Sequence, residues 1–477
     1  MTAAKQKAPK MDAMQEILDK QKAAFIAQGP TGYEQRIKEL DRIGTAIRQR
    51  CDQIVDAMVE DFGSRSRHEI LIAEINTTLS IIHYTKKNLK KWMRPRKRCV
   101  GMIFMPGKAR VYMEPLGVVG VISPWNYPFY LAMVPVISAL AAGNRVMLKP
   151  SVFTPRTSQC MKDLFGAVFE PEKVSVIFSG PGVGSAFSNL AFDHICFTGS
   201  TSVGRQVMRA ASENLTPVTL ELGGKSPAII AHDYDIVAGA ERIAHGKCFN
   251  AGQTCIAPDY ALAPEGKVDQ FVEAFQNAIH IFYPTLAKNS DYTAIITQRH
   301  FERLHTGLKD AEEKGAKVIS INPAKETLDP ADKKIAPTLV LGGNDDMILL
   351  QDEIFGPILP VVPYSDLDQA IAYVNARPKP LALYYFSNQK PWINKILHMT
   401  QSGGVTINNT LLHVAQDDLP FGGVGPSGMG AYHGPEGFET FSNKRGVFFQ
   451  GSPSSHKLIR PPYSKGLEKI LRFLIDR

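Results

Sequence analysis

Two short motifs hold the side chains of this chain that are best suited to covalent chemistry. Positions 221–225 read Glu-Leu-Gly-Gly-Lys and supply the carboxylate of Glu221, whereas positions 252–255 read Gly-Gln-Thr-Cys and supply the thiol of Cys255. Both groups stand beside glycines, which let the backbone approach a ligand closely. A thiol nucleophile with a carboxylate base nearby can react with a carbonyl group. Each residue also has a simpler interpretation, Cys255 as a buried structural cysteine and Glu221 as a solvated loop residue.

A third candidate, Asn126, lies in the loop 123–128, which reads Ser-Pro-Trp-Asn-Tyr-Pro and follows an apolar strand predicted at 117–122. The two prolines stiffen this loop, so that a side-chain amide can be held as a donor to a developing oxyanion. An ordinary turn asparagine is the alternative. The residues alone leave both interpretations open.

Three further segments have residue types suited to a nucleotide. Positions 197–204 run from a strand into a helix with glycine and hydroxyl groups at the helix start, a plausible phosphate seat. They lack both the Gly-x-Gly-x-x-Gly spacing and the lysine of a P-loop. Lys149 and Ser151, at the end of another strand, could neutralise a phosphate or hold a ribose. Glu353, beside Phe355, could order a ribose, with a surface turn as the alternative.

Hydrophobic periodicity predicts the elements that must position these residues. Residues 11–92 have helical spacing, and residues 98–113 read as extended around a Pro-Gly turn. From residue 116, and again from 226 to about 415, apolar strands alternate with helices, which predicts parallel sheets covered on both faces. Such sheets bind ligands at the carboxyl ends of their strands. In the second segment, strands are predicted near 227–231, 316–320, 338–341, 381–386 and 403–407, and helices near 235–249, 267–280, 299–314 and 366–376.

Composition favours an ordinary globular enzyme. Of the 477 residues, 44% are hydrophobic and 21% charged, and the formal net charge is +8. Because the basic residues are scattered, we expect no nucleic-acid partner. The longest apolar stretch, 129–143, contains a proline and is shorter than the ~20 residues that a membrane span needs. Residues 467–477 are interpreted as a packed amphipathic helix, with a membrane-surface helix as the alternative, so membrane association is not expected.

The cysteine pattern bears on metals and on the compartment. The six cysteines include no Cys-x-x-Cys pair, and the chain has no His-Glu-x-x-His, so no metal site is expected. Six cysteines in so long a chain do not suggest a disulfide framework. We therefore interpret them as reduced and the protein as cytoplasmic.

The motifs together resemble those of the aldehyde dehydrogenase superfamily, in the same order, and the resemblance extends from about residue 15 to 470. They are Pro-Trp-Asn-Tyr-Pro at 124–128, Lys-Pro-Ser at 149–151, Phe-Thr-Gly-Ser at 197–200, the motifs at 221–225 and 252–255, and Glu-Ile-Phe-Gly-Pro at 353–357. Positions 419–434, from Leu-Pro-Phe-Gly-Gly to Tyr-His-Gly, resemble the class 3 branch. Pro-Pro-Tyr at 461–463 is most similar to bacterial coniferyl aldehyde dehydrogenases.

The resemblance implies an α/β fold with an aldehyde dehydrogenase-like division. It comprises a Rossmann-like dinucleotide-binding domain (1–94 and 114–221), an α/β catalytic domain (222–415), a small oligomerisation arm (95–113 and 440–455) and a C-terminal tail (456–477). The class 3 branch also implies a homodimer.

The resemblance further implies NAD(P)-dependent oxidation of an aldehyde to the carboxylic acid. The substrate is a medium-chain aliphatic or aromatic aldehyde, with coniferyl aldehyde among the candidates. Cys255 forms a thiohemiacetal and then a thioester, Asn126 and the Cys255 N–H hold the oxyanion, and Glu221 activates water. Tyr127, Thr254 and His433 are expected to line the substrate pocket. The residues expected to bind the dinucleotide are Ile122, Trp125, Lys149, Ser151, Val152, Gly199, Ser200, Gly204, Leu222, Glu353 and Phe355.

One departure from the family pattern concerns the cofactor. NAD-preferring members usually carry a glutamate three residues after the lysine, where this chain has Val152. A carboxylate there would repel a 2′-phosphate, whereas valine cannot. We therefore expect NADP to be accepted, with Lys149 and Ser151 able to meet its phosphate. Two other classes of protein stay open at this point, a cofactor-independent thiol esterase and a non-catalytic dinucleotide-binding protein.

Overall fold

The N-terminal part of the chain is helical, as the periodicity predicts. The structure is a computed structural model and describes residues 11–178, 180–452 and 460–476. The third helix ends at Gly63, whose φ of 80° favours glycine and stops the helix. The elements are α1 (Met11–Gln28), α2 (Tyr33–Gln49), α3 (Cys51–Phe62), α4 (Arg67–Ile70), a π-helical turn η1 (Leu71–Asn76) and α5 (Thr77–Trp92).

The first sheet has six strands in the order β15-β7-β6-β3-β4-β5, and all its neighbours are parallel except β15 with β7. Its strands are β3 (Val118–Ile122), β4 (Arg145–Lys149), β5 (Val174–Val176), β6 (His194–Thr198), β7 (Val218–Glu221) and β15 (Gly428–Met429). Its helices are α6 (Tyr130–Ala142), α7 (Pro155–Val168), α8 (Val183–Ser188) and α9 (Thr201–Ser212). Side chains alternate between two cores: Val119 and Val146 pack with α2, α5 and α6, whereas Val118 and Met147 pack with α1, α8 and α9. The prediction of a parallel sheet covered on both faces is confirmed here.

The second sheet has seven strands in the order β10-β11-β12-β9-β8-β13-β14, and only the β10–β11 pair is antiparallel. Its strands are β8 (Pro227–Ile230), β9 (Tyr260–Pro264), β10 (Lys317–Ser320), β11 (Thr338–Leu341), β12 (Ile358–Tyr364), β13 (Ala382–Phe386) and β14 (Gly404–Ile407). Its helices are α10 (Ile236–Cys248), α11 (Val268–Phe282), α12 (Gln298–Glu313), α13 (Ile348–Gln351), α14 (Leu367–Asn375) and α15 (Lys390–Met399). Short 3₁₀ turns are η2 (Met102–Phe104), η3 (Phe249–Gly252), η4 (Glu265–Lys267) and η5 (Pro330–Asp332).

Hydrophobic periodicity located five of these seven strands and missed β9 and β12, as well as the helices α13 and α15. The two missed strands lie at the centre of the sheet. β12 contains Pro360 and Pro363, which cannot donate to a ladder and which normally indicate an edge strand or a loop. The local composition of β12 therefore disfavours a strand, and β12 forms because it pairs with its neighbours in the sheet.

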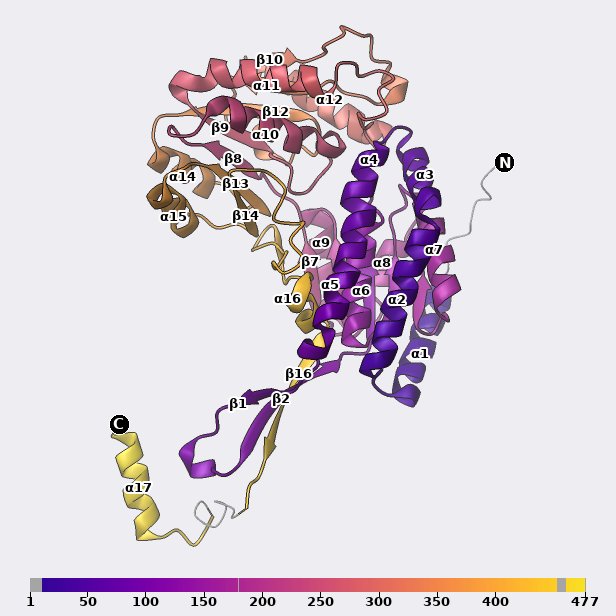
Figure 1. The fold of residues 1–477 in the computed structure, drawn as a ribbon, viewed down its shortest axis with the longest axis vertical. Coiled ribbons are helices and arrows are strands. Elements are labelled where there is room, and N and C mark those ends of the chain that lie inside the picture. Colours follow the sequence, from indigo (N-terminus) through magenta and orange to yellow (C-terminus); the bar gives the residue numbers. More distant parts are fainter. Residues whose placement is uncertain (1–10, 179, 453–459, 477) are drawn as a thin grey trace.

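A three-stranded antiparallel sheet, which we call the arm, projects from the body of the molecule (Figure 1). It consists of β1 (Arg96–Arg98), β2 (Lys108–Pro115) and β16 (Ser442–Phe449), with β2 between the other two. β16 lies within the segment 440–455 that was expected to form part of the arm, and it follows α16 (Gly434–Thr440). The last helix, α17 (Lys465–Ile475), lies at the far end of the arm (Figure 1). Among the described residues, no helix combines the length and the apolar character needed to cross a membrane.

Candidate active site

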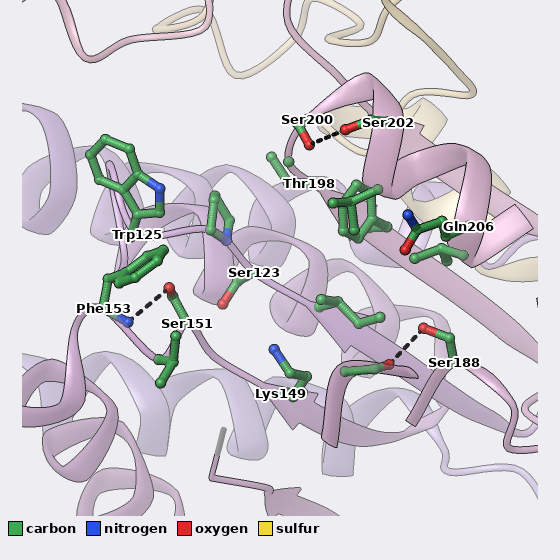
Figure 2. Close-up of a pocket in the computed structure, with 18 of the residues that line it drawn as sticks. Ser123, Trp125, Lys149, Ser151, Phe153, Ser188, Thr198, Ser200, Ser202 and Gln206 are labelled. Carbon is green, nitrogen blue, oxygen red and sulfur yellow. Dashed lines mark hydrogen bonds between the residues drawn. The ribbon is translucent and has the colours of Figure 1, made fainter. Parts of the chain in front are cut away.

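A cavity of about 810 Å³ opens at the carboxyl ends of the strands of the first sheet (Figure 2). Its walls come from the loops after β3, β4 and β6 and from the helices α8, α9 and α12. This is the edge at which a parallel sheet binds ligands. Seven of the residues expected to bind a dinucleotide line it: Ile122, Trp125, Lys149, Ser151, Val152, Gly199 and Ser200.

The electrostatics of this cavity favour an anion. Lys149, Arg299 and Arg303 line it, and none of the described lining residues is acidic. Burial lowers the pKa of Lys149 to about 8. Ser200 precedes the first turn of α9, where unpaired backbone N–H groups and the helix dipole attract phosphate. The residues present therefore fit the pyrophosphate of a dinucleotide.

Two of the expected dinucleotide residues lie behind this wall rather than on it. A Cβ added at Gly204 would stand 2.7 Å from Leu222 Cδ2, so the glycine lets α9 pack closely against that side chain. Leu222 is itself buried in the core beneath the cavity. The positions of Gly204 and Leu222 indicate that they shape the phosphate-binding site through packing.

Glu353 and Phe355 reach the site from the second α/β unit. Phe355 contacts the edge of Trp125, with ring centroids 5.4 Å apart. The carboxylate of Glu353 lies so close to the turn after β7 that a Cβ at Gly223 would be 2.1 Å from Oε2. Burial, the largest effect, raises the pKa of Glu353 to about 8. The glycine of the Glu-Leu-Gly-Gly-Lys motif thus makes room for a second buried carboxyl group.

A second, apolar cavity of about 270 Å³ is lined by Cys255. Two residues expected in the substrate pocket, Tyr127 and Thr254, also line it, and their hydroxyl oxygens are 2.7 Å apart. His433 is not among the lining residues. Its ring stacks behind Phe421, which does line the cavity, at a centroid distance of 4.9 Å.

Other walls of this cavity carry no motif. One wall comes from the turn of the N-terminal helices that contains Ile72, Ala73 and Thr77. Another comes from the loop after β14, at 409–415, and includes the half-exposed Leu412. The sequence contains one sign of this wall, which is the pair of adjacent leucines Leu411 and Leu412. They come shortly after two asparagines and fit neither helical nor strand periodicity.

The loop that carries Cys255 has an unusual backbone. Asn250 and Ala251 have φ values of 52° and 51°, in the left-handed region, and Gly252 follows with 72°. A Cβ at Gly252 would stand 2.3 Å from the carbonyl oxygen of Gly356, so only glycine fits. Burial, with smaller contributions from Glu353 and Glu221, raises the pKa of the Cys255 thiol. The resting group is therefore a thiol, and reaction requires a base.

Glu221, at the end of β7, is a suitable base. Its side chain is 2% exposed, and neither carboxylate oxygen has a hydrogen-bond partner within the described part of the chain. Burial raises the pKa of this carboxyl well above its ordinary value. A buried carboxyl group without a structural partner is typical of a catalytic rather than a structural residue.

Asn126 is brought to the same place by a contact between loops. It is 3% exposed, and its carbonyl oxygen accepts a hydrogen bond of 3.1 Å from the side-chain nitrogen of Asn250. The structure therefore brings the loops of Asn126 and Cys255 together although 129 positions separate the two residues in the chain.

The site combines an anion-binding cavity of nucleotide size with a half-buried thiol and a buried carboxyl group that has no hydrogen-bond partner among the described residues. This combination defines a thiol-dependent oxidoreductase. The chain belongs to the aldehyde dehydrogenase family, whose sequence pattern matches residues 2–447. It is an enzyme that oxidises aldehydes with NAD(P).

Relatives agree over nearly the whole length. A probable coniferyl aldehyde dehydrogenase of Pseudomonas aeruginosa is 50% identical over 467 residues, which covers 98% of this chain and 97% of that protein. The substrate-bound state of AldH from Staphylococcus aureus has a TM-score of 0.91 and 37% identity, covering 97% and 99% of the two chains. An aldehyde dehydrogenase of Mycobacterium tuberculosis complexed with NAD+ has a TM-score of 0.83 and 30% identity, covering 92% and 89%.

Proposed function

We propose that this enzyme oxidises aromatic or medium-chain aliphatic aldehydes, coniferyl aldehyde among them, with Cys255 as the nucleophile. The observation that carries the proposal is the apolar cavity with Cys255 in its wall, because an apolar wall suits a ring or an alkyl chain. The name of the Pseudomonas aeruginosa relative supports the aromatic substrate.

Residues of this chain carry out every step of the proposed reaction except acceptance of the hydride. Glu221 takes the thiol proton, and the Cys255 sulfur then adds to the carbonyl carbon, giving a thiohemiacetal. The Asn126 amide and the Cys255 N–H hold the resulting oxyanion. The bound dinucleotide supplies the acceptor for the hydride lost as the oxyanion collapses to a thioester. Glu221, its first proton released to solvent, deprotonates a water, whose oxygen adds to the thioester, and cleavage of the C–S bond releases the acid.

The first experiment follows reduced nicotinamide by its ultraviolet absorbance with cinnamaldehyde and with hexanal. We expect turnover with both. Turnover of hexanal alone would contradict the aromatic substrate class, and failure of both would contradict the roles of Cys255 and Glu221.

We propose that the expected dinucleotide residues hold the cofactor and that NADP is accepted beside NAD. Val152 lines the cavity and is 55% exposed, and no acidic group among the described lining residues opposes a 2′-phosphate. Lys149 and Ser151 stand on the same wall. The nucleotide cavity would thus tolerate the extra phosphate.

Val152→Glu should shift the ratio of kcat/KM for NAD over NADP toward NAD, on the order of tenfold, because the added carboxylate repels the 2′-phosphate. Initial rates at several concentrations of each dinucleotide measure the ratio. Val152→Gln, which adds similar bulk without charge, is the matched control and should leave the ratio nearly unchanged. An equal shift in both variants would contradict the electrostatic argument.

We also propose the domain division 1–94 with 114–221, 222–415, 95–113 with 440–455, and 456–477. These bounds leave 416–439 unassigned, and that segment contains β15, which pairs with β7 of the first sheet. Residues 453–455 of the arm segment, and residues 456–459 and 477 of the tail, lie outside the described residues.

We further propose a homodimer formed through the arm, because the arm exposes apolar side chains such as Phe448 and Phe449. A monomeric mass by light scattering would contradict it.

A cytoplasmic location is proposed because the six cysteines are all free and the nucleophile must stay reduced. Cell fractionation tests this location.

A further inference from the structure

A short segment of the N-terminal helices contacts both loops of the active site, although it carries none of the sequence motifs. The segment is 65–77 and includes α4, the π-helical turn η1 and the start of α5. Glu74 Oε2 accepts hydrogen bonds from the N–H groups of Phe129 (2.8 Å) and Tyr130 (3.1 Å), just after the loop of Asn126. π-Helical turns inside helices frequently occur at functional sites.

The contact to the nucleophile loop is made by Glu69. Its Oε2 accepts a hydrogen bond of 2.9 Å from the backbone N–H of Asn250. Ser66 and Glu69 have the spacing of a capping box, in which the glutamate would normally fold back to the N–H of Ser66. Ser66 does accept from the N–H of Glu69 at 3.4 Å, but the Glu69 carboxylate reaches across to Asn250 instead. Glu69 therefore forms a long-range hydrogen bond with Asn250 in place of the local hydrogen bond with Ser66.

Asn250 connects Glu69 to the loop of Asn126 and to the loop of Cys255. Its backbone is left-handed, a conformation that a non-glycine residue keeps only when its surroundings enforce it. Its side-chain nitrogen donates to the carbonyl oxygens of Asn126 (3.1 Å) and Gln253 (3.2 Å). Asn250 thus joins the oxyanion loop to the nucleophile loop at Gln253, which is two positions before Cys255.

A second path runs from the same segment through Arg65. Its guanidinium forms a buried ion pair of 2.7 Å with Glu74 and lies 5.2 Å from the ring centre of Tyr127. The Tyr127 hydroxyl is 2.7 Å from the hydroxyl of Thr254, the neighbour of Cys255. Ile72, Ala73 and Thr77 of the segment also line the substrate cavity, so the segment contacts the oxyanion loop, the nucleophile loop and this cavity.

We propose that Glu69 is a positioning residue, which holds Asn250 so that the Cys255 thiol and the Asn126 amide meet the same carbonyl group. The inference rests on the proposed roles of Cys255 and Asn126. What Glu69 supplies is an acceptor oxygen rather than a charge. Burial raises its pKa to about 7, and a carboxyl group keeps a carbonyl oxygen that accepts the N–H in either protonation state.

Glu69→Ala should lower kcat about 100-fold, the scale of a small misplacement of reacting groups, with KM for aldehyde changed less than threefold. Acylation of Cys255 by p-nitrophenyl acetate, measured without dinucleotide, should fall by a similar factor. Glu69→Gln keeps an acceptor oxygen at the same place and should restore both rates to within about fivefold of the unaltered enzyme. Glu60→Ala is the matched control, because Glu60 is an exposed glutamate on α3 that forms an ion pair with Arg156.

The inference is overturned if Glu69→Ala acylates at the normal rate, or if Glu69→Gln is as impaired as Glu69→Ala. Should Glu69→Ala fail to fold, Asn250→Ala provides the second test. It keeps the N–H but removes the link to Asn126, and normal acylation in that variant overturns the inference too. Turnover by Cys255→Ala would instead contradict the proposed function. An inactive Cys255→Ala beside a normal Glu69→Ala would contradict only the role of Glu69.

Discussion

Replacing Cys255 by alanine should lower aldehyde oxidation by about four to six orders of magnitude, the scale seen when a covalent nucleophile is removed. No other group in the wall of the 270 Å³ cavity can form the thioester, because Cys255 is the only cysteine among the described lining residues. Dinucleotide affinity should change little, since Cys255 does not line the 810 Å³ cavity. Steady-state rates and calorimetric titration with NAD and NADP measure the two effects.

Cys99→Ala is the matched control for this experiment. Cys99 is an exposed free cysteine beside the arm, far along the chain from every motif, and its loss should leave turnover unchanged. Ester hydrolysis should disappear together with aldehyde oxidation in Cys255→Ala if both use one nucleophile. Ester turnover that persists would indicate a separate hydrolytic group, and persistent aldehyde oxidation would remove the basis of the mechanism.

Glu221→Gln should slow both proton transfers that the mechanism assigns to Glu221, from the Cys255 thiol and from the hydrolytic water. The amide has nearly the shape of the carboxylate but cannot take a proton from either group. We expect a first turnover of reduced nicotinamide, at most one per active site, that is slower than in the unaltered enzyme, followed by a steady rate lowered by about two to four orders of magnitude. Stopped-flow absorbance resolves the two phases. An unchanged steady rate would show that another group activates the water.

The pH dependence of the steady rate gives the same residue a second test. The base is active only when ionised, and burial raises the pKa of Glu221, so it ionises at a higher pH than an ordinary glutamate. The steady rate of the unaltered enzyme should therefore rise with pH as this carboxyl ionises. The residual rate of Glu221→Gln should lack that rise. A rise that survives the substitution would belong to another group, such as the Cys255 thiol, whose pKa is also raised.

Local residue patterns predicted much of the fold correctly. Alternating apolar strands and helices identified both α/β units, because each strand of a covered parallel sheet is apolar on both faces. The N-terminal helices were predicted as well. β12 was missed because Pro360 and Pro363 contradict a strand locally, while its neighbours β9 and β11 enforce one.

The candidate site was only partly visible in the residues. Motifs identified Cys255, Glu221 and most of the residues that line the 810 Å³ cavity, since glycines and strand ends leave local signals. Ile72 and Thr77 have no such signal, because they are ordinary apolar or hydroxyl side chains on helices. His433 was expected in the substrate pocket but stacks behind Phe421. Which of the two rings faces the cavity depends on packing and cannot be predicted from residue type.

The sequence by itself determined the reacting groups and the elements that carry them, because residue chemistry and hydrophobic periodicity are properties of short stretches of chain. Only the tertiary structure decided which of these stretches meet. The contact from Glu69 to Asn250 spans 181 positions, and that from Asn250 to Asn126 spans 124. Contacts over such distances depend on how whole layers pack, and the packing also sets the burial that raises the pKa of Glu221.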